Sequence, residues 1–510
     1  MTRQVLDKLS INANVSYLDS ESSQLTSKFA RASLSGIYDF GKFWSGLRYD
    51  LEDNEEVRAD SNEFTANTQR FSSYEVYSGV GDSTDVYVEL GYRYRQNDSL
   101  RANVLQSVNT SSNYFTRSQL VNSKSTTLRV FANLRNLKFA EEGRDDEQSL
   151  NSRVTFSQNL WDRLVNLNTT YETNSGSIAQ QEFSYVEVEP GQGQYTWIDY
   201  NENGIQELNE FEIAQFQDEG RYVRILLPNQ VFVRTNQTRL SQQVTLNFLK
   251  WQNEEGFKKL ASKFYNQTSL LLDKKLRKDG NALSLNPFGD DGQEVLGDNT
   301  TFRNIIFFNR GLQKFTTSYN FSQNTTKNLS LLGLQENSNT LHELKFIHNF
   351  KESWLLTLTQ NVNSSESFSD RFENRNFKIE GFNLNPKVSY LLGDKRFDVF
   401  YELSEKKNQL GEMESLDQQT FGLSFTLNNA QKYSINGEVN FIQNKFEGSA
   451  FSPVAYQLLE GLQPNDNFTW SLFLQKKITD FLDLNLTYFG RKSETANAIH
   501  TGSVQLRAYF

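Results

Sequence analysis

The chain has 510 residues, with 52 Lys and Arg against 62 Asp and Glu. Its formal net charge of −10 makes nucleic acid an unexpected partner. The absence of Cys excludes disulfides and Cys-ligated metal sites. Hydrophobic residues make up only 37%, yet there are 40 Phe and 22 Tyr, and no apolar run approaches the about 18 residues of a transmembrane helix. This composition suits a protein whose apolar surface is one thin outward band.

Apolar residues fall on every second position from Leu9 onward. A period of two predicts a strand with one apolar and one polar face. In the first such segment Leu9, Ile11 and Val15 alternate with Ser and Asn. The same alternation predicts strands at 9–17, 30–38, 43–51, 74–80, 86–94, 112–122, 124–138, 148–160, 164–174, 237–249, 258–272, 299–309, 313–323, 338–350, 353–363, 375–391, 397–403, 421–427, 433–441, 468–474, 482–488 and 504–510.

The predicted connections alternate between short turns and long loops. Short turns are expected at 40–42, 161–163, 309–311, 393–395 and 428–431, and long loops at 19–26, 52–69, 273–298, 324–337, 364–374, 443–466 and 491–498. The chain then stops on Phe510. This pattern predicts an all-β fold, a single transmembrane antiparallel β-barrel over residues 1–510 with about 22 strands, within a range of roughly 18 to 24. Short turns would be periplasmic and long loops extracellular, with Phe510 at the periplasmic rim.

A soluble β-sandwich or β-solenoid is the alternative, because both also alternate. Long strands, charges of both signs on the polar face and the lack of a fixed repeat favour the barrel. No secretion signal follows Met1, since Asp7 and Lys8 interrupt any apolar core. An outer-membrane protein must be exported, so we expect the chain to be a mature or truncated form. Whether a signal or a periplasmic domain precedes it is left open.

The longest departure from the strand pattern is an insert at 175–236, expected to be an extracellular loop. Within it, residues 199–210 read DYNENGIQELNE and fit the EF-hand calcium loop D-x-[DN]-x-[DN]-G-x₅-E at every position. Calcium requires six to eight oxygen ligands. The predicted ligands are the side chains of Asp199, Asn201 and Asn203, the backbone carbonyl of Ile205, Glu207 directly or through water, and a bidentate Glu210.

The expected role of this calcium is structural, because it would order a loop too long to order itself. Tyr195 to Ile198 reads as a strand, so no helix precedes the loop, and a calcium sensor is not expected. Residues 211–216 are expected to begin a short helix. The alternative is an Asn- and Gly-rich turn without metal, since these residues are common turn formers.

The barrel pattern, together with the segment from Tyr195 through Glu212, resembles the large outer-membrane barrels of the Bacteroidota, which are rich in Asn, Phe and Tyr. The resemblance covers the barrel architecture in general and only this insert in sequence. It identifies no specific family. Members of that broad group include nutrient transporters and components of secretion or assembly machines.

The sequence offers little for catalysis. His342 and His348 fall on the apolar face, where a rim or lipid-interface position is expected. His500 is expected near the extracellular end of the last strand, but no nucleophile motif accompanies it and no phosphate-binding Gly loop is present. We therefore expect no enzyme. Charged residues of both signs are predicted to face a polar lumen: Glu89, Arg93, Arg95, Lys345, Arg396, Asp398, Glu402, Glu438, Asp483 and Arg507.

These features predict a protein of the bacterial outer membrane that forms a transport or translocation pathway for solutes or polypeptide. A barrel of this size is wide enough to need a plug. We expect the insert at 175–236, a partner or a further domain to close it. The alternative is a structural barrel subunit of an outer-membrane secretion, assembly or surface-lipoprotein complex. Expected partners are outer-membrane lipid and, as possibilities left open, a surface lipoprotein, a plug or other complex subunits.

Overall fold

The computed structural model describes residues 2–6, 8–82, 84–290, 292–311, 314–330, 333–429 and 432–509. Contacts within the backbone divide the chain into two compact units. Unit 1 comprises 1–178, 233–244 and 272–295, and unit 2 comprises 179–232, 245–271 and 296–510. Within the described residues the fold is all-β, with 25 strands in hydrogen-bonded sheet structure. No helix in the described part of the chain combines the length and hydropathy of a membrane span.

In unit 1 each strand pairs antiparallel with the next along the chain, from β1 to β10. β10 continues past the end of this unit. These strands are β1 (Thr2–Leu6), β2 (Leu9–Glu21), β3 (Leu25–Asp39), β4 (Phe43–Arg58), β5 (Gln69–Gly81), β6 (Tyr87–Arg101), β7 (Val104–Asn122), β8 (Thr126–Phe139), β9 (Glu147–Leu160) and β10 (Val165–Glu187).

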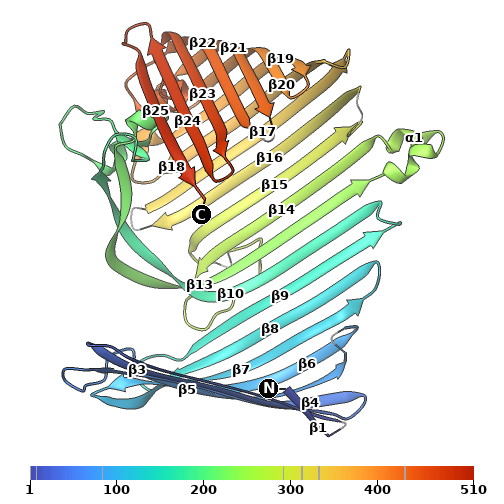
Figure 1. The fold of residues 1–510 in the computed structure, drawn as a ribbon, viewed down its shortest axis with the longest axis vertical. Helices are drawn as coiled ribbons and strands as arrows, with labels where there is room; N and C mark the ends of the chain where they lie inside the picture. Colours follow the sequence, from blue (N-terminus) through green and yellow to red (C-terminus); the bar gives the residue numbers. More distant parts are fainter. Residues whose placement is uncertain are drawn as a thin grey trace. The chain divides into compact units, whose positions relative to one another are not determined.

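Unit 2 contains a second such ladder, in which β15 to β25 pair antiparallel in chain order. Strands β15 to β18 run side by side in Figure 1. The members are β15 (Val295–Phe308), β16 (Phe315–Ser330), β17 (Gly333–Phe350), β18 (Trp354–Ser369), β19 (Phe377–Leu392), β20 (Lys395–Asn408), β21 (Ser415–Asn429), β22 (Tyr433–Glu447), β23 (Asn465–Thr479), β24 (Leu482–Ser493) and β25 (Ile499–Ala508).

The remaining elements are two long strands and several short elements in the connections. Strands β13 (Tyr222–Asn247) and β14 (Phe264–Arg277) each have residues in both units. Strands β11 (Tyr195–Trp197) and β12 (Phe211–Ile213) form a small ladder in the insert. Short helices are η1 (Leu208–Glu210), η2 (Gln217–Glu219), η3 (Leu249–Asn253), α1 (Phe257–Ala261), η4 (Glu373–Arg375) and α2 (Pro453–Leu459).

The predicted count of about 22 strands is consistent with this structure. Of the 25 strands, β1, β11 and β12 have five residues or fewer, which leaves 22 strands of ten residues or more. Predicted turns at 40–42, 161–163 and 393–395 fall at strand ends. Phe510 and part of the predicted turn at 428–431 lie outside the described residues. Closure of the strands into a barrel stays a prediction.

Several strands are longer than the sequence predicted, and the largest extensions include ends next to predicted long loops. The clearest error is the expected long loop at 324–337, because β16 continues to Ser330 and β17 begins at Gly333. Residues Thr325 to Asn328 are polar on both faces, so the apolar signal stops while the backbone ladder continues. The predicted strand at 258–272 also begins wrongly, since Phe257–Ala261 is a helix rich in Lys, Leu and Ala, which favour helices.

The strands place their large apolar side chains on an exposed face and their charged side chains on a sheltered one. On β20, Phe397, Val399 and Tyr401 are exposed, whereas Asp398 between them is buried. On β5 of unit 1, Tyr74 and Val76 are exposed around a buried Glu75. Within each unit this arrangement is the reverse of a soluble sandwich, in which apolar faces are buried against each other. It is typical of strands that face lipid on one side.

Close packing between strands depends on glycines that lie opposite aromatic rings. Gly91 pairs with Phe115, and Gly490 pairs with Trp470. A Cβ added to either glycine would overlap the ring across the ladder. Phe400 covers Gly422 in the same way. At these positions a side chain of any size is excluded by the neighbouring strand.

Candidate functional site

The insert between β10 and β13 folds as a small body of its own. Strand β10 extends to Glu187 and β13 starts at Tyr222, so the irregular part is residues 188–221, inside the insert expected at 175–236. Strand β11 confirms the predicted extended segment before the acidic loop. The short helix expected at 211–216 is wrong: after the single turn η1, residues 211–213 form β12 and pair with β11. Phe211 is buried in this ladder, and that burial favours the strand.

Aromatic packing holds the insert together. The Phe211 ring is stacked on Tyr185 of β10, with ring centroids 4.0 Å apart, and meets the Tyr222 ring edge-on at 5.0 Å. Tyr185 also contacts Tyr195 edge-on at 5.0 Å. Such pairs contribute about 0.5–1.5 kcal/mol each beyond the area they bury. The insert therefore has a defined shape that can present its other side chains in fixed positions.

One edge of the insert is bound by the loop after β18. Arg375 of η4 donates to Glu212 Oε2 at 2.6 Å and to the carbonyl oxygen of Phe211 at 3.0 Å. Burial raises the pKa of Glu212 to about 7, while the charge of Arg375 acts in the opposite direction. Both partners are drawn out of water by docking, so their bond to each other compensates a large desolvation cost.

A second edge of the insert is bound by β24 and β25. Arg491 donates to both carboxylate oxygens of Asp218, at 2.5 and 2.9 Å, and to Glu219 Oε1 at 2.8 Å. The same guanidinium lies 4.1 Å from the centroid of the Phe216 ring. Thr501 of β25 adds a contact of 3.4 Å to Asp218. Only 14% of the Arg491 side chain is exposed, so this is a desolvated, forked ion pair of the strongest kind.

Helix α2, in the loop after β22, completes the docking surface. The Tyr456 hydroxyl accepts a hydrogen bond from the Gln215 N–H at 3.2 Å and lies 3.3 Å from both the Ile213 carbonyl oxygen and Glu219 Oε2. Leu458 on the same helix is fully buried in an apolar cluster with Ile379 and Val454. Ser452 caps the helix by accepting from the Ala455 N–H at 3.1 Å. The helix is thus anchored to the strands before it contacts the insert.

A cavity of 370 Å³ lies between the insert and β22 to β25. Its lining includes Phe216 and Asp218 from the insert and Glu438, Asn440, Phe489 and Arg491 from the strands. Glu438 was predicted to face a polar lumen, and it lines this cavity. The insert therefore covers part of the polar face of unit 2 and leaves a mixed polar and aromatic space beneath it.

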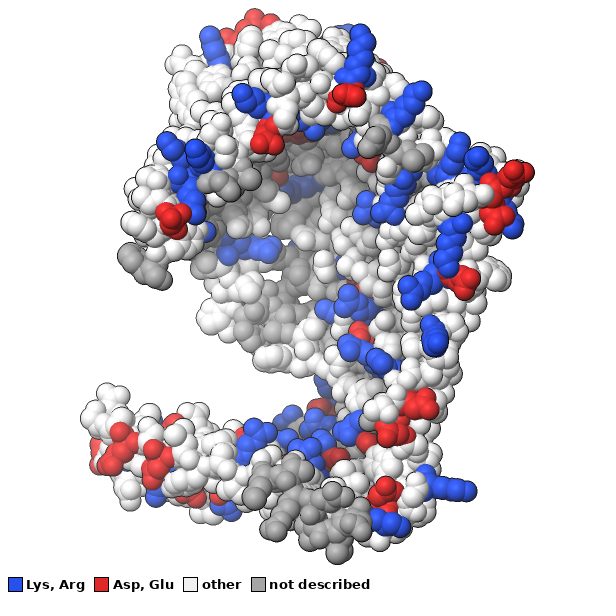
Figure 2. All heavy atoms as spheres, turned by 45° about the vertical axis from the view of Figure 1, so that its right-hand side comes forward, with Lys and Arg blue, Asp and Glu red and all other residues white. Residues whose placement is uncertain are grey.

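Other residues predicted to face the lumen lie on the same polar faces. Arg93 donates to Glu75 at 2.5 Å, and Arg117 pairs with Glu89 at 2.9 Å. Glu402 accepts from the amides of two Asn residues on β19, at 2.7 and 2.8 Å. Figure 2 shows Lys and Arg interleaved with Asp and Glu on the face in view. The sequence predicted a polar face with charges of both signs, and the structure adds that these charges are paired across strands.

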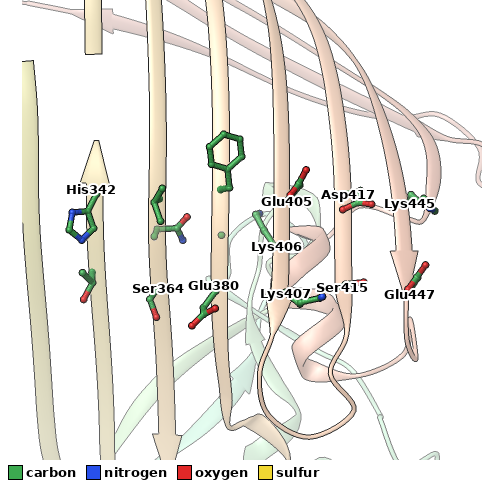
Figure 3. Close-up of a pocket in the computed structure, with 15 residues that line it drawn as sticks. His342, Ser364, Glu380, Glu405, Lys406, Lys407, Ser415, Asp417, Lys445 and Glu447 are labelled. Atoms are coloured by element: carbon green, nitrogen blue, oxygen red, sulfur yellow. The ribbon is translucent and has the colours of Figure 1, made fainter. Parts of the chain in front are cut away.

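A second depression, of 770 Å³, lies over β17 to β22 (Figure 3). Glu405 of β20, Asp417 of β21 and Lys445 of β22 are direct cross-strand neighbours in it. They continue, toward the long loops, the face on which Tyr401 and Phe421 are exposed. The depression therefore marks the level at which this outer face changes from apolar to charged.

In the acidic loop at 199–210, hydrogen bonds connect several of the predicted calcium ligands to one another. Asp199 accepts from the N–H groups of Asn203 and Gly204, at 3.1 and 2.7 Å, and Asn203 Oδ1 accepts from the Ile205 N–H at 2.6 Å. Gly204 has a φ of +72°, which a glycine adopts without strain. The Asn201 amide donates to Glu207 Oε2 at 3.0 Å.

Glu210 is the most deeply buried member of this set. Its side chain is 1% exposed, and its Oε1 has no hydrogen-bond partner among the described residues. Its Oε2 accepts from Trp197 Nε1 at 2.8 Å and lies 3.3 Å from the Glu207 N–H. Across the described residues, no three His, Cys, Asp or Glu side chains form a group that could hold a metal ion.

The three histidines have aromatic rather than catalytic neighbours. His342 Nδ1 lies 2.8 Å from the Tyr319 hydroxyl, and His500 Nδ1 lies 2.8 Å from the Tyr488 hydroxyl. The His348 ring is stacked between Phe346 and Phe350. In the described part of the chain, neither a Ser hydroxyl nor a carboxylate is recorded as bonded to any of these imidazoles. This geometry offers no nucleophile, base and acid in series.

No protein-family model and no curated protein matches this chain. Solved structures match over most of its length. The FrpB iron transporter of Neisseria meningitidis (F3-3 variant) is 11% identical, with a TM-score of 0.35 over 99% of this chain and 81% of that one. BauA, the ferric preacinetobactin receptor of Acinetobacter baumannii, is 10% identical, with a TM-score of 0.35 over 98% and 74%.

The copper transporter OprC is also 10% identical, with a TM-score of 0.35 over 94% of this chain and 74% of that chain. TM-scores below 0.5 at these identities assign neither a family nor a function to the chain.

The residues that dock the insert were not found from the sequence. Arg375 and Arg491 lie more than 160 positions after the acids they bind, at separations of 163 and 273 residues. Arg491 is the first residue of the predicted loop 491–498, where a charged residue is ordinary. One signal was available: Asp218 and Glu219 are adjacent acids in an insert that also holds Phe216, and a forked cation is the natural partner for such a group.

Proposed function

We propose that this chain spans the bacterial outer membrane and forms a transport or translocation pathway for solutes or polypeptide, with the insert at 175–236 as a cover over its polar interior. The exposed apolar face of both ladders supports the membrane position, because it needs a lipid environment to be stable. The change from apolar to charged residues at Glu405, Asp417 and Lys445 supports a membrane interface at that level.

The observation that carries the proposal is the docking of the insert on the polar face of unit 2. Three anchors hold it: Arg375, Arg491 and Tyr456. A polar face in contact with water is already stable, so the docking of the insert supports a role in covering this face. A cover held mainly by ion pairs can also be released by a ligand or partner that competes for the same charges.

Conductance of the purified full chain in a planar lipid bilayer tests the proposal. The wild-type protein and a D218N/E219Q variant, which removes the acids that bind Arg491, are compared under the same conditions. We expect small or rare openings in the wild type and larger, more frequent ones in the variant. A variant that forms a stable, heat-modifiable barrel but carries no current in any trace contradicts a pathway through this chain.

A structural role in an outer-membrane complex is the second candidate, and one observation favours it. The insert exposes Ile205 at 63% and Ile213 at 65%. Large apolar side chains on an otherwise polar, rigid surface are typical of a protein contact. Purification of the full chain from its native membrane, with and without an I205D/I213D change, tests this role. Loss of a stoichiometric partner from the variant alone supports it, and the absence of any partner from both contradicts it.

We also propose that the chain is not an enzyme. The aromatic surroundings of His342, His348 and His500 support this view.

A further inference from the structure

Glu210 requires an explanation that the docking of the insert does not give. An ionised carboxylate that is removed from water without a counter-charge costs several kcal/mol. The neighbouring acids of the insert have such a partner, since the buried Glu212 binds Arg375 and the half-buried Glu219 binds Arg491. For Glu210 no ion pair with Lys, Arg or His is recorded within the described residues, and its Oε1 has no hydrogen-bond partner there.

The bonded oxygen of Glu210, Oε2, connects this side chain to the acidic loop. The Glu207 N–H lies 3.3 Å from Glu210 Oε2, and the Glu207 carboxylate is in turn bound by the Asn201 amide. Asn201 Oδ1 and Asp199 Oδ1 both accept from the Asn203 N–H, at 3.0 and 3.1 Å. These bonds connect Glu210, through Glu207, to residues 199–203 of the loop. The buried, half-satisfied carboxylate is therefore a second and independent sign of a ligand, in addition to the spacing of the loop.

The chemistry of the donors selects the ligand. Asp199, Glu207 and Glu210 supply three carboxylates, Asn201 and Asn203 supply amide oxygens, and Ile205 supplies a carbonyl. A set made only of oxygen atoms, on a loop that can adjust, suits Ca²⁺ with six to eight ligands at 2.3–2.6 Å. Mg²⁺ requires near-ideal octahedral geometry and is bound less well by such a loop.

We propose that residues 199–210 bind one Ca²⁺ through Asp199, Asn201, Asn203, the Ile205 carbonyl, Glu207 and a bidentate Glu210, and that the ion locks residues 211–219 of the insert onto the strands and loops of the same unit. The second part follows from the connectivity. Glu210 is covalently continuous with β12, which carries Glu212 to Arg375, and η2 with Asp218 and Glu219 follows directly. Fixing Glu210 therefore fixes the start of the segment that reaches both arginines. This proposal does not depend on transport.

Trp197 provides a direct measurement of the ion. Its Nε1 lies 2.8 Å from Glu210 Oε2, so a Tb³⁺ ion in the Ca²⁺ position would be excited by energy transfer from this indole. The full chain in detergent micelles is titrated with Tb³⁺, and the bound Tb³⁺ is then displaced by Ca²⁺ or Mg²⁺ up to about 10 mM, a range that covers calcium sites of extracellular modules. We expect saturable Tb³⁺ emission, displaced at least tenfold more readily by Ca²⁺ than by Mg²⁺.

Variants assign the emission to this loop. D199N and E210Q each remove one ligand charge at constant shape, and we expect Tb³⁺ affinity to fall at least tenfold in both. E202Q is the matched control, because Glu202 lies in the same loop at a position that supplies no ligand, and its affinity should stay within about twofold. W197F should lose the emission. Equal Tb³⁺ affinity in the wild type, D199N and E210Q overturns the site.

Hydrogen exchange of residues 211–222 tests the lock separately. Ca²⁺ is expected to slow exchange there at least tenfold in the wild type and in W197F, and EDTA to reverse the effect. In D199N, Ca²⁺ should have no effect on exchange. If Tb³⁺ binds as expected but Ca²⁺ leaves exchange in 211–222 unchanged in the wild type, the lock is overturned while the site stands. Heat-modifiable migration of each variant shows that the strands have folded.

Discussion

The polar faces of the two units use arginine in different ways. In unit 1, Arg93 pairs with Glu75 and Arg117 with Glu89, in each case on a neighbouring strand. In unit 2, Arg375 and Arg491 pair with acids of the insert. The unit 1 pairs join residues 18 and 28 positions apart, whereas Arg491 binds an acid 273 positions away.

The cross-strand pairs of unit 1 stabilise the polar face on which they lie. The pairs of Arg375 and Arg491 instead hold the insert in its docked position. A cross-strand pair forms as soon as its two strands pair, and it leaves little unsatisfied charge behind. Arg491 has its forked partner only when the insert is docked. The Arg117 side chain is 44% exposed, whereas the Arg491 side chain is only 14% exposed. The ion pair of Arg491 with Asp218 therefore forms with a larger desolvation of the guanidinium than the pair of Arg117 with Glu89. Three substitutions test the comparison.

Replacement of Arg491 by alanine should have the largest effect. It leaves Asp218 and Glu219 in a sheltered place without a cation, and breaking a buried pair in this way costs about 3–5 kcal/mol. We expect the insert to detach while the strands stay folded. Hydrogen exchange over 211–222 should rise by at least a hundredfold. Normal protection in Arg491→Ala would show that the insert is held mainly by its aromatic contacts.

Replacement of Tyr456 by phenylalanine should have an intermediate effect. The change removes one hydroxyl that bonds the Gln215 N–H and contacts Glu219, without changing the ring. A lost hydrogen bond of this kind costs about 1–2 kcal/mol, and more where the partner is charged. Exchange at Gln215 should rise about tenfold, with little change at Phe211. A uniform rise over the whole insert would mean that the anchors act together.

Replacement of Arg117 by alanine should have the smallest effect. The Arg117 side chain is 44% exposed, and a cross-strand pair with such an exposed partner contributes about 0–1 kcal/mol. Water can reach Glu89 once the arginine side chain is gone. We expect a shift in the denaturation midpoint of the full chain that is close to the error of the measurement. An effect as large as that of Arg491→Ala would contradict the distinction between the two faces.

The sequence predicted the parts of the fold that alternate. Phe397 to Leu403 and the strands beside them were recognised because a two-residue period survives only where one face is apolar. The segments beyond that band, such as Thr325 to Asn328, were missed because hydrogen bonds between backbones continue where both faces are polar. The alternation therefore predicts the extent of the apolar band and not the full length of each strand.

The acidic loop could be predicted from the sequence, whereas the docking residues could not. The ligand positions of residues 199–210 were predicted because such a loop fixes its spacing within one turn, although whether an ion binds there stays a prediction. Arg375 and Arg491 carry no local signal, because their role depends on a contact across hundreds of positions. The strand expected instead of α1 was a local error, since Lys258 to Ala261 favour a helix once the apolar alternation is weak.

The glycines that lie under aromatic rings have a consequence for assembly fidelity. A two-residue period cannot tell a strand from the same strand shifted by two positions, because both registers keep apolar residues on one face. The ring of Trp470 fits opposite Gly490 but would meet the side chain of Tyr488 or Lys492 after such a shift. Phe115 opposite Gly91 acts in the same way. These pairs encode the alignment that the repeating pattern leaves ambiguous, and so they make only one of the near-equivalent strand pairings sterically allowed.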